Sequence, residues 1–176
     1  MPAALDAAAI ERVDHALIAI ARNEQFAAPW SRPSPPLDRV SNFDVRELGD
    51  VMATATTPPM VDQVQLSPFE YRRGLLRSAQ ERGVALEAYS PLGTGRHLGD
   101  RTVGKIAARA GRTPAQVLLR WCLQRDAVVI TKSTHRERIA ENAQVFDFAL
   151  GDDDMAALDG LDRTGGTDRA LERPWW

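Results

Sequence analysis

From about residue 40 onward, short apolar segments alternate with segments that have the pattern of amphipathic helices. The apolar segments are Met60–Leu66, Val84–Tyr89 and Ala127–Thr131, and helices are expected over residues 44–55, 69–82, 100–110, from 113 onward, just beyond 131 and over 152–161. Short apolar strands between helices are typical of a parallel sheet with both faces covered. This part of the chain is therefore predicted to be an α/β domain.

Capping residues mark several of the expected helix boundaries. Asp44 with Glu47, and Thr113 with Gln116, have the spacing of capping boxes, in which each side chain accepts from the other residue's backbone N–H. Gly83 stands where the helix over residues 69–82 should end, a position at which glycine is favoured. These signals support the alternation of strands and helices independently of hydrophobicity.

The first 39 residues have a different character. Residues 3–22 are predicted to form an amphipathic helix, because Ile10, Val13, Leu17 and Ile20 recur at steps of three and four. Residues 27–39 contain four prolines, which predicts an extended linker. We therefore expect residues 1–39 to be a helix and linker, and residues 40–176 to be the α/β domain.

Polar residues lie where the expected strands end. They are Ser41 and Asn42, which follow at best the remnant of a strand at Leu37–Val40, Tyr89 and Ser90, and Lys132 and Ser133. Ligands of open parallel sheets and barrels bind at the carboxyl ends of the strands, which places all of these residues at one edge. Gln63, midway along its strand, is expected to point to the same side as Gln65.

The segment after the last strand is rich in positive charge. Lys132 follows the strand, and Arg136 and Arg138 fall in the first turn of the next helix, for which Thr134 and Glu137 predict a capping box. A helix N-terminus carries unpaired N–H groups and a partial positive charge, so cations there indicate a bound anion such as a phosphate. The alternative is a solvated basic turn paired with Glu137 and Glu141.

Composition excludes several classes of partner and location. The formal net charge is −2 and the pI is about 5.9, which argues against nucleic acid as a partner. No apolar run approaches the roughly 18 residues of a membrane span, and acidic residues in the N-terminal apolar stretch argue against a targeting sequence. The single cysteine, Cys122, fits a reducing cytoplasm. Nothing in the pattern suggests a metal site.

Beyond Ser41 the sequence resembles the C-terminal half of the aldo-keto reductases, particularly bacterial diketogluconate-reductase-like members. The resemblance rests on the following segments, in the family's order: SNF at 41–43, VDQVQLSPF at 61–69, GVALEAYSPLGTG at 83–95, TPAQVLLRWCLQ at 113–124, VITKSTHRERIAENAQVFDF at 129–148 and DDDMAALDGL at 152–161. It implies a partial (β/α)8 barrel of the TIM type, a C-terminal half-barrel with three to four parallel strands. It also implies NADP(H) as cofactor and the reduction of aldehydes or ketones.

The resemblance also implies roles for individual residues. Ser41, Asn42 and Gln63 would bind the nicotinamide carboxamide, and Tyr89 would stack on the nicotinamide ring. Ser90, Leu92 and Thr94 would line a loop at the pyrophosphate. Lys132, Ser133 and Arg138 would hold the adenosine 2′-phosphate, with Glu141 and Asn142 near the adenine. The family usually has proline at the position of Thr131.

Catalysis in the family uses an Asp, a Tyr, a Lys and a His from the first half of the barrel. Upstream of Ser41 this chain has no tyrosine and no lysine, and Tyr71 and Lys105 are expected on helices outside the barrel. We therefore expect no catalytic residues and no reductase activity of the chain alone.

Three interpretations stay open. The chain is a truncated reductase that retains part of the dinucleotide surface. It is a binding or assembly module whose open sheet edges associate with a second copy, or with a partner half that completes a site for a carbonyl substrate. Or it is a product of gene decay or of a misplaced start.

Overall fold

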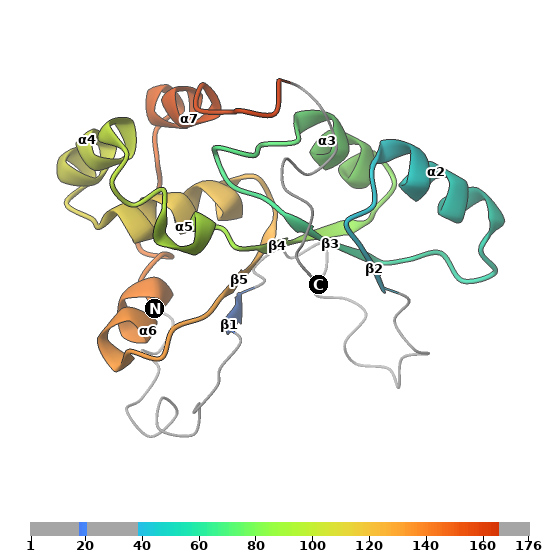
Figure 1. Cartoon of the computed structure of the whole chain (residues 1–176), viewed down its shortest axis with the longest axis horizontal. Helices are drawn as coiled ribbons and strands as arrows, with labels where there is room; N and C mark the ends of the chain where they lie inside the picture. Colours follow the sequence, from blue (N-terminus) through green and yellow to red (C-terminus); the bar gives the residue numbers. More distant parts are fainter. Residues whose placement is uncertain (1–17, 21–38, 166–176) are drawn as a thin grey trace.

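Four parallel strands and the helices between them make up the framework of the molecule. The computed structural model describes residues 18–20 and 39–165 (Figure 1). The elements in chain order are β1 (Ile18–Ile20), β2 (Arg39–Ser41), α2 (Val45–Thr54), β3 (Val61–Gln65), α3 (Arg73–Glu81), β4 (Ala85–Tyr89), α4 (Arg101–Ala110), α5 (Pro114–Gln124), β5 (Val128–Thr131), α6 (Arg136–Ala143) and α7 (Asp152–Asp159). The predicted alternation of strands and helices is confirmed.

The sheet has the strand order β1-β5-β4-β3-β2. Strands β2 to β5 are parallel to their neighbours, whereas β1 pairs antiparallel with β5, Ile18 lying opposite Thr131. The carboxyl ends of β2, β3, β4 and β5 therefore lie at the same edge of the sheet. That edge contains the residues predicted to bind a ligand.

The hydrophobic core lies between one face of the sheet and the helices. Val64, Ala88 and Val129 lie on this face with almost no exposed surface, and they join the cluster that includes Leu75 of α3 and Trp121 of α5. Figure 1 shows α3 and α5 on the same side of the strands. On the other face, Gln63 and its neighbours along the strand stay half-exposed, because the side chains of a strand alternate between its two faces.

Several helix boundaries lie where capping residues in the sequence predicted them. Asp44 and Thr113 form the two predicted capping boxes, of α2 and α5. Gly83 follows α3 with a φ of +69°, in the left-handed region that glycine adopts easily. Asp100 caps α4 by accepting from the N–H groups of Thr102 and Val103.

The prediction of a helix over residues 3–22 is wrong at Ile18–Ile20, which forms β1; the rest of that segment and the proline-rich segment lie outside the described residues. Two isoleucines in three residues suit a strand, and the edge of β5 offers unpaired backbone groups that a helix would leave unsatisfied. Tertiary pairing has therefore overridden a helical periodicity.

The segment from Phe69 to Arg72 is also not helical, contrary to the prediction. Ser67 and Glu70 exchange backbone hydrogen bonds in a tight turn, and Arg72 has a φ of +47°, so that α3 begins only at Arg73. Tyr71 consequently lies in a loop rather than on a helix, buried with its ring edge-on to Trp121 at 5.0 Å between centroids.

Candidate functional site

Four of the predicted residues form one hydrogen-bonded row across the ends of β2, β3 and β4. The Tyr89 hydroxyl donates to Asn42 Oδ1 at 2.9 Å, and Asn42 Nδ2 donates to Ser41 Oγ at 3.1 Å. Ser41 Oγ donates in turn to the backbone carbonyl of Gln63 at 3.1 Å. The same backbone carbonyl also accepts from the Asn42 N–H at 2.9 Å. Residues distant in sequence are thus held together as the strand-end argument predicted.

Gln63 connects this row to charges that the sequence did not indicate. Its Nε2 donates to Glu87 Oε2 at 2.9 Å, and Glu87 also pairs with Arg39 at 3.2 Å. The Glu87 side chain is only 5% exposed, against 57% for Arg39. Among the described residues, Gln63 Oε1 accepts no hydrogen bond, so the amide presents an acceptor on the half-exposed face of the sheet.

Burial raises the pKa of the Tyr89 phenol above its ordinary value, and the nearby Glu70 carboxylate raises it further. Burial likewise raises the pKa of Tyr71. Each of these two tyrosines is therefore a weaker acid than an ordinary phenol.

The loop after β4 is tightly coiled. Ser90 and Thr94 have positive φ values of +50° and +55°, and a 3₁₀ turn covers Gly93–Gly95. The Ser90 carbonyl accepts from the Gly93 N–H at 2.8 Å, while Leu92 packs against the core. The loop therefore follows directly from Tyr89 and keeps Ser90, Leu92 and Thr94 beside the end of β4.

The helix that follows the basic segment after β5 has no side-chain cap at its N-terminus. The predicted capping box at Thr134 is absent: α6 begins at Arg136, and its N-cap residue His135 makes no side-chain cap. Instead, Ser133 Oγ accepts from the His135 N–H at 3.1 Å, which shifts the start of the helix by one residue. The first-turn N–H groups of α6 thus keep their capacity to bind an anion.

Lys132, Arg136 and Arg138 are exposed, and Arg136 and Arg138 lie in the first turn of α6 as predicted. Within the part of the chain that the structure describes, none of the three pairs with a carboxylate. The pairing with Glu137 and Glu141 that the alternative required is therefore not formed.

Glu141 and Asn142 have internal partners. Thr113 Oγ1 donates to Glu141 Oε1 at 2.5 Å, and Asn142 Nδ2 donates to Thr131 Oγ1 at 3.0 Å, with both Asn142 and Thr131 buried. These contacts tie α6 to α5 and to the end of β5. The threonine at the position where proline is usual therefore has a structural partner, which the sequence did not indicate.

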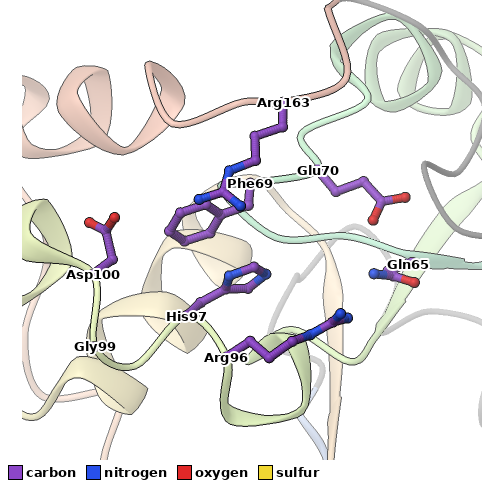
Figure 2. A pocket seen from close by; sticks show the side chains of 8 residues that line it. All are labelled: Gln65, Phe69, Glu70, Arg96, His97, Gly99, Asp100 and Arg163. Atoms are coloured by element: carbon purple, nitrogen blue, oxygen red, sulfur yellow. The ribbon is translucent and has the colours of Figure 1, made fainter.

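A cavity of about 440 Å³ lies beside this edge of the sheet (Figure 2). Its lining comes from the end of β3, the turn after β3, the loop after β4 and the segment after α7: Gln65, Phe69, Glu70, Arg96, His97, Gly99, Asp100 and Arg163. His97 stacks on Phe69 at 3.9 Å between centroids, and the Arg163 guanidinium lies 4.9 Å from the same ring. Gln65 lies opposite Tyr89 in the sheet, so the cavity adjoins the polar row. The sequence did not predict it.

Comparison with known proteins identifies aldo-keto reductases as relatives of this chain. A family model described as the aldo/keto reductase family matches residues 39–163. An aldo-keto reductase of Mycolicibacterium vanbaalenii is 48% identical over 123 residues, which are 70% of this chain and 44% of that protein. The uncharacterised oxidoreductase YtbE of Bacillus subtilis is 43% identical over 122 residues, covering 69% of this chain and 44% of that protein.

Solved structures of similar sequence share the fold of this chain. The apo form of Gox0644 superposes with a TM-score of 0.69 at 42% identity, covering 72% of this chain and 47% of that one. A variant of Gox0644 in complex with NADPH superposes with a TM-score of 0.68, also at 42% identity and with the same coverage. The chain spans about half the length of the relatives it matches.

Proposed function

Because this chain belongs to the aldo-keto reductase family, we propose that it provides the NADP(H)-binding surface of an oxidoreductase acting on aldehydes or ketones. The observation that carries the proposal is the hydrogen-bonded row of Ser41, Asn42, Gln63 and Tyr89 at the strand ends. When bound, NADPH supplies a hydride; the residues of this chain bind and orient it.

The row suits a nicotinamide carboxamide. That group carries two N–H donors and one acceptor oxygen, and Gln63 Oε1 is an acceptor with no partner among the described residues. The half-buried Tyr89 ring, whose hydroxyl is held by Asn42, presents an aromatic surface beside it. The nicotinamide end would therefore lie over the ends of β3 and β4, with Ser90, Leu92 and Thr94 toward the pyrophosphate.

The uncapped start of α6 suits the phosphate of the adenosine ribose. Lys132 and Arg138 supply charge, and Ser133 and the first-turn N–H groups supply donors. This end of the site distinguishes NADPH from NADH, since only NADPH carries the 2′-phosphate. Glu141 and Asn142 lie one turn further along the helix, toward the adenine.

Calorimetric titration with NADPH tests this function. The Gln63→Leu substitution removes the acceptor oxygen and should weaken binding by about fivefold, the equivalent of one hydrogen bond of about 1 kcal/mol. Gln80→Leu is the matched control, because it makes the same change at an exposed position of α3, away from the carboxyl ends of the strands. Equal losses in the two variants, or no binding to the wild-type chain, would contradict the proposal.

Association with a second polypeptide is a further candidate function. β2 is the last strand of the sheet and has no second neighbour among the described residues, while the other edge of β5 is taken by β1. A strand with one unpaired edge is a template for pairing with another chain. A second copy, or a partner half that completes a site for the carbonyl substrate, would pair there. Sedimentation velocity at micromolar concentration should then show a dimer or a complex; a persistent monomer would contradict self-association.

No helix in the described part of the chain is long and apolar enough to cross a membrane. We propose the cytoplasm as location, which suits a chain whose single cysteine, Cys122, cannot form an internal disulfide.

A further inference from the structure

Asn42, the central residue of the polar row, has an uncommon backbone conformation. Its φ is +60°, in the left-handed region, which few non-glycine residues adopt, although asparagine does so more readily than most. Such a conformation persists only when its surroundings hold it. The hydrogen bond from its own N–H to Gln63 fixes one side of the residue. The side toward Phe43 has a restraint of its own.

Two buried charged side chains supply that restraint. Asp62 Oδ1 accepts from the Phe43 N–H at 3.4 Å, and Arg72 Nη2 donates to the Phe43 carbonyl at 3.3 Å. Asp62 is completely buried and Arg72 is 1% exposed. The residue after Asn42 is thus held at both its backbone groups, from β3 on one side and from the loop before α3 on the other.

The surroundings of Asp62 offer few partners besides the Phe43 N–H and the nearby charge of Arg72. Its neighbours in the adjacent strands are Val40 and Leu86, both apolar, and Asp62 Oδ2 has no hydrogen-bond partner among the described residues. Burial raises the pKa of the Asp62 carboxyl to about 6, although the Phe43 N–H and the charge of Arg72 lower it. A buried charge of this kind contributes little to stability compared with an apolar residue, so a positional role accounts for it better.

We propose that Asp62 and Arg72 are positioning residues, which hold the Phe43 peptide so that Asn42 presents its side chain to the nicotinamide end of the cofactor. Neither residue touches the cofactor. Their effect passes through Asn42, which contacts Tyr89 and Ser41. This inference rests on the proposed function, because it assigns a role toward the same site.

The test compares two ligands that share one end. NADPH occupies the whole proposed site, whereas adenosine 2′,5′-bisphosphate reaches only the adenosine and phosphate end at α6. Asp62→Ala should weaken NADPH binding by about tenfold and leave binding of the bisphosphate unchanged. Asp62→Asn keeps an oxygen that accepts from the Phe43 N–H, so it should restore most of the NADPH affinity.

Val64→Ala is the control for a general loss of stability, since it truncates a fully buried side chain on the same strand. It should leave the ratio of the two affinities unchanged. If Asp62→Ala fails to fold, Arg72→Met removes the contact to the Phe43 carbonyl and should give the same selective loss.

Equal losses for both ligands, or an unchanged NADPH affinity, would overturn the inference while leaving the proposed function intact. If the wild-type chain binds neither ligand, the proposed function fails first and the inference fails with it.

Discussion

At the scale of single residues, the side chains proposed to face a ligand differ from those that hold other residues in place. Ser41, Asn42 and Gln63 are polar, adjacent and partly exposed, whereas Asp62 is buried one residue away on the opposite face of β3. The alternation of the strand thus places a binding residue and a positioning residue next to each other in the sequence.

Arg138 tests the phosphate end of the site. Arg138→Ala should lower NADPH affinity by about fivefold, or roughly 1 kcal/mol for an exposed charge-assisted contact, and leave NADH affinity nearly unchanged. Calorimetry with both dinucleotides measures the ratio. Arg77→Ala, on the exposed face of α3, is the control. An equal loss for both dinucleotides would contradict a 2′-phosphate contact.

Asp62 predicts a pH dependence of stability. Its carboxyl pKa is about 6 in the folded chain against 3.8 ordinarily, so between these values the folded state binds more protons than the unfolded state. Its contribution to the free energy of unfolding should therefore fall as pH rises from about 4 to about 6. Asp62→Asn does not titrate, so the variant should gain stability relative to the wild type over this range. Urea unfolding at several pH values measures the difference; parallel curves would contradict it.

The charged residues of β3 and β4 make contacts that could not be predicted from the sequence. Asp62 and Glu87 belong to strands β3 and β4, and a charged residue in a strand is normally expected to face solvent. Both are buried and have specific partners. Their partners Phe43 and Arg39 come from other elements, so no local pattern reveals these contacts. The strand-end residues, in contrast, were predictable because topology alone brings them together.

At the scale of elements, the helix starts were predictable wherever the cap is local. Asp44 and Thr113 cap their helices through residues three positions away, as their spacing indicated. The starts of α3 and α6 were not predictable. At the start of α3, Arg72 has a left-handed backbone conformation and its side chain contacts Phe43. At the start of α6, Ser133 Oγ accepts from the His135 N–H, and Thr134 does not cap the helix. β1 likewise depends on pairing with the distant strand β5.

The junction of β5 and α6 predicts a cost for losing one hydroxyl. Thr131→Val keeps the shape of the side chain but leaves the buried Asn142 amide without its acceptor, which should lower the free energy of unfolding by about 1–3 kcal/mol. Thr131→Ser keeps the hydroxyl and should cost less than half as much. Urea unfolding of both variants measures this, and equal stability of wild type and Thr131→Val would show that the contact does not matter.

At the scale of the whole molecule, a partial barrel with three to four parallel strands was predicted, and it is confirmed by the four parallel strands of the sheet and by the structural relatives. Periodicity was sufficient for the parallel α/β sheet, because it depends on sequence that is contiguous within each strand–helix unit, whereas the barrel was implied by the resemblance to the aldo-keto reductases. The division at residue 39 stays a prediction, although the family match begins at that residue.

The electrostatics predict that the chain alone does not reduce carbonyl compounds. Burial raises the pKa of Tyr71 and of Tyr89, and the charges nearest each come from arginines and acidic residues rather than a lysine. With NADPH and 4-nitrobenzaldehyde, the rate of absorbance loss at the NADPH band should equal that of buffer. A rate above buffer that disappears in Tyr89→Phe would contradict this.

The central claim is that one continuous edge of this half-barrel binds NADPH, from the row at Ser41 to the start of α6. Two-dimensional NMR of the ¹⁵N-labelled chain during titration with NADPH tests it most directly, since each backbone amide reports its own surroundings. We predict shifts at the backbone amides of residues 41–43, 63, 89–94 (except Pro91) and 132–138, with the last group shifting much less when NADH replaces NADPH. Shifts confined to other surfaces, or no shifts at millimolar NADPH, would contradict it.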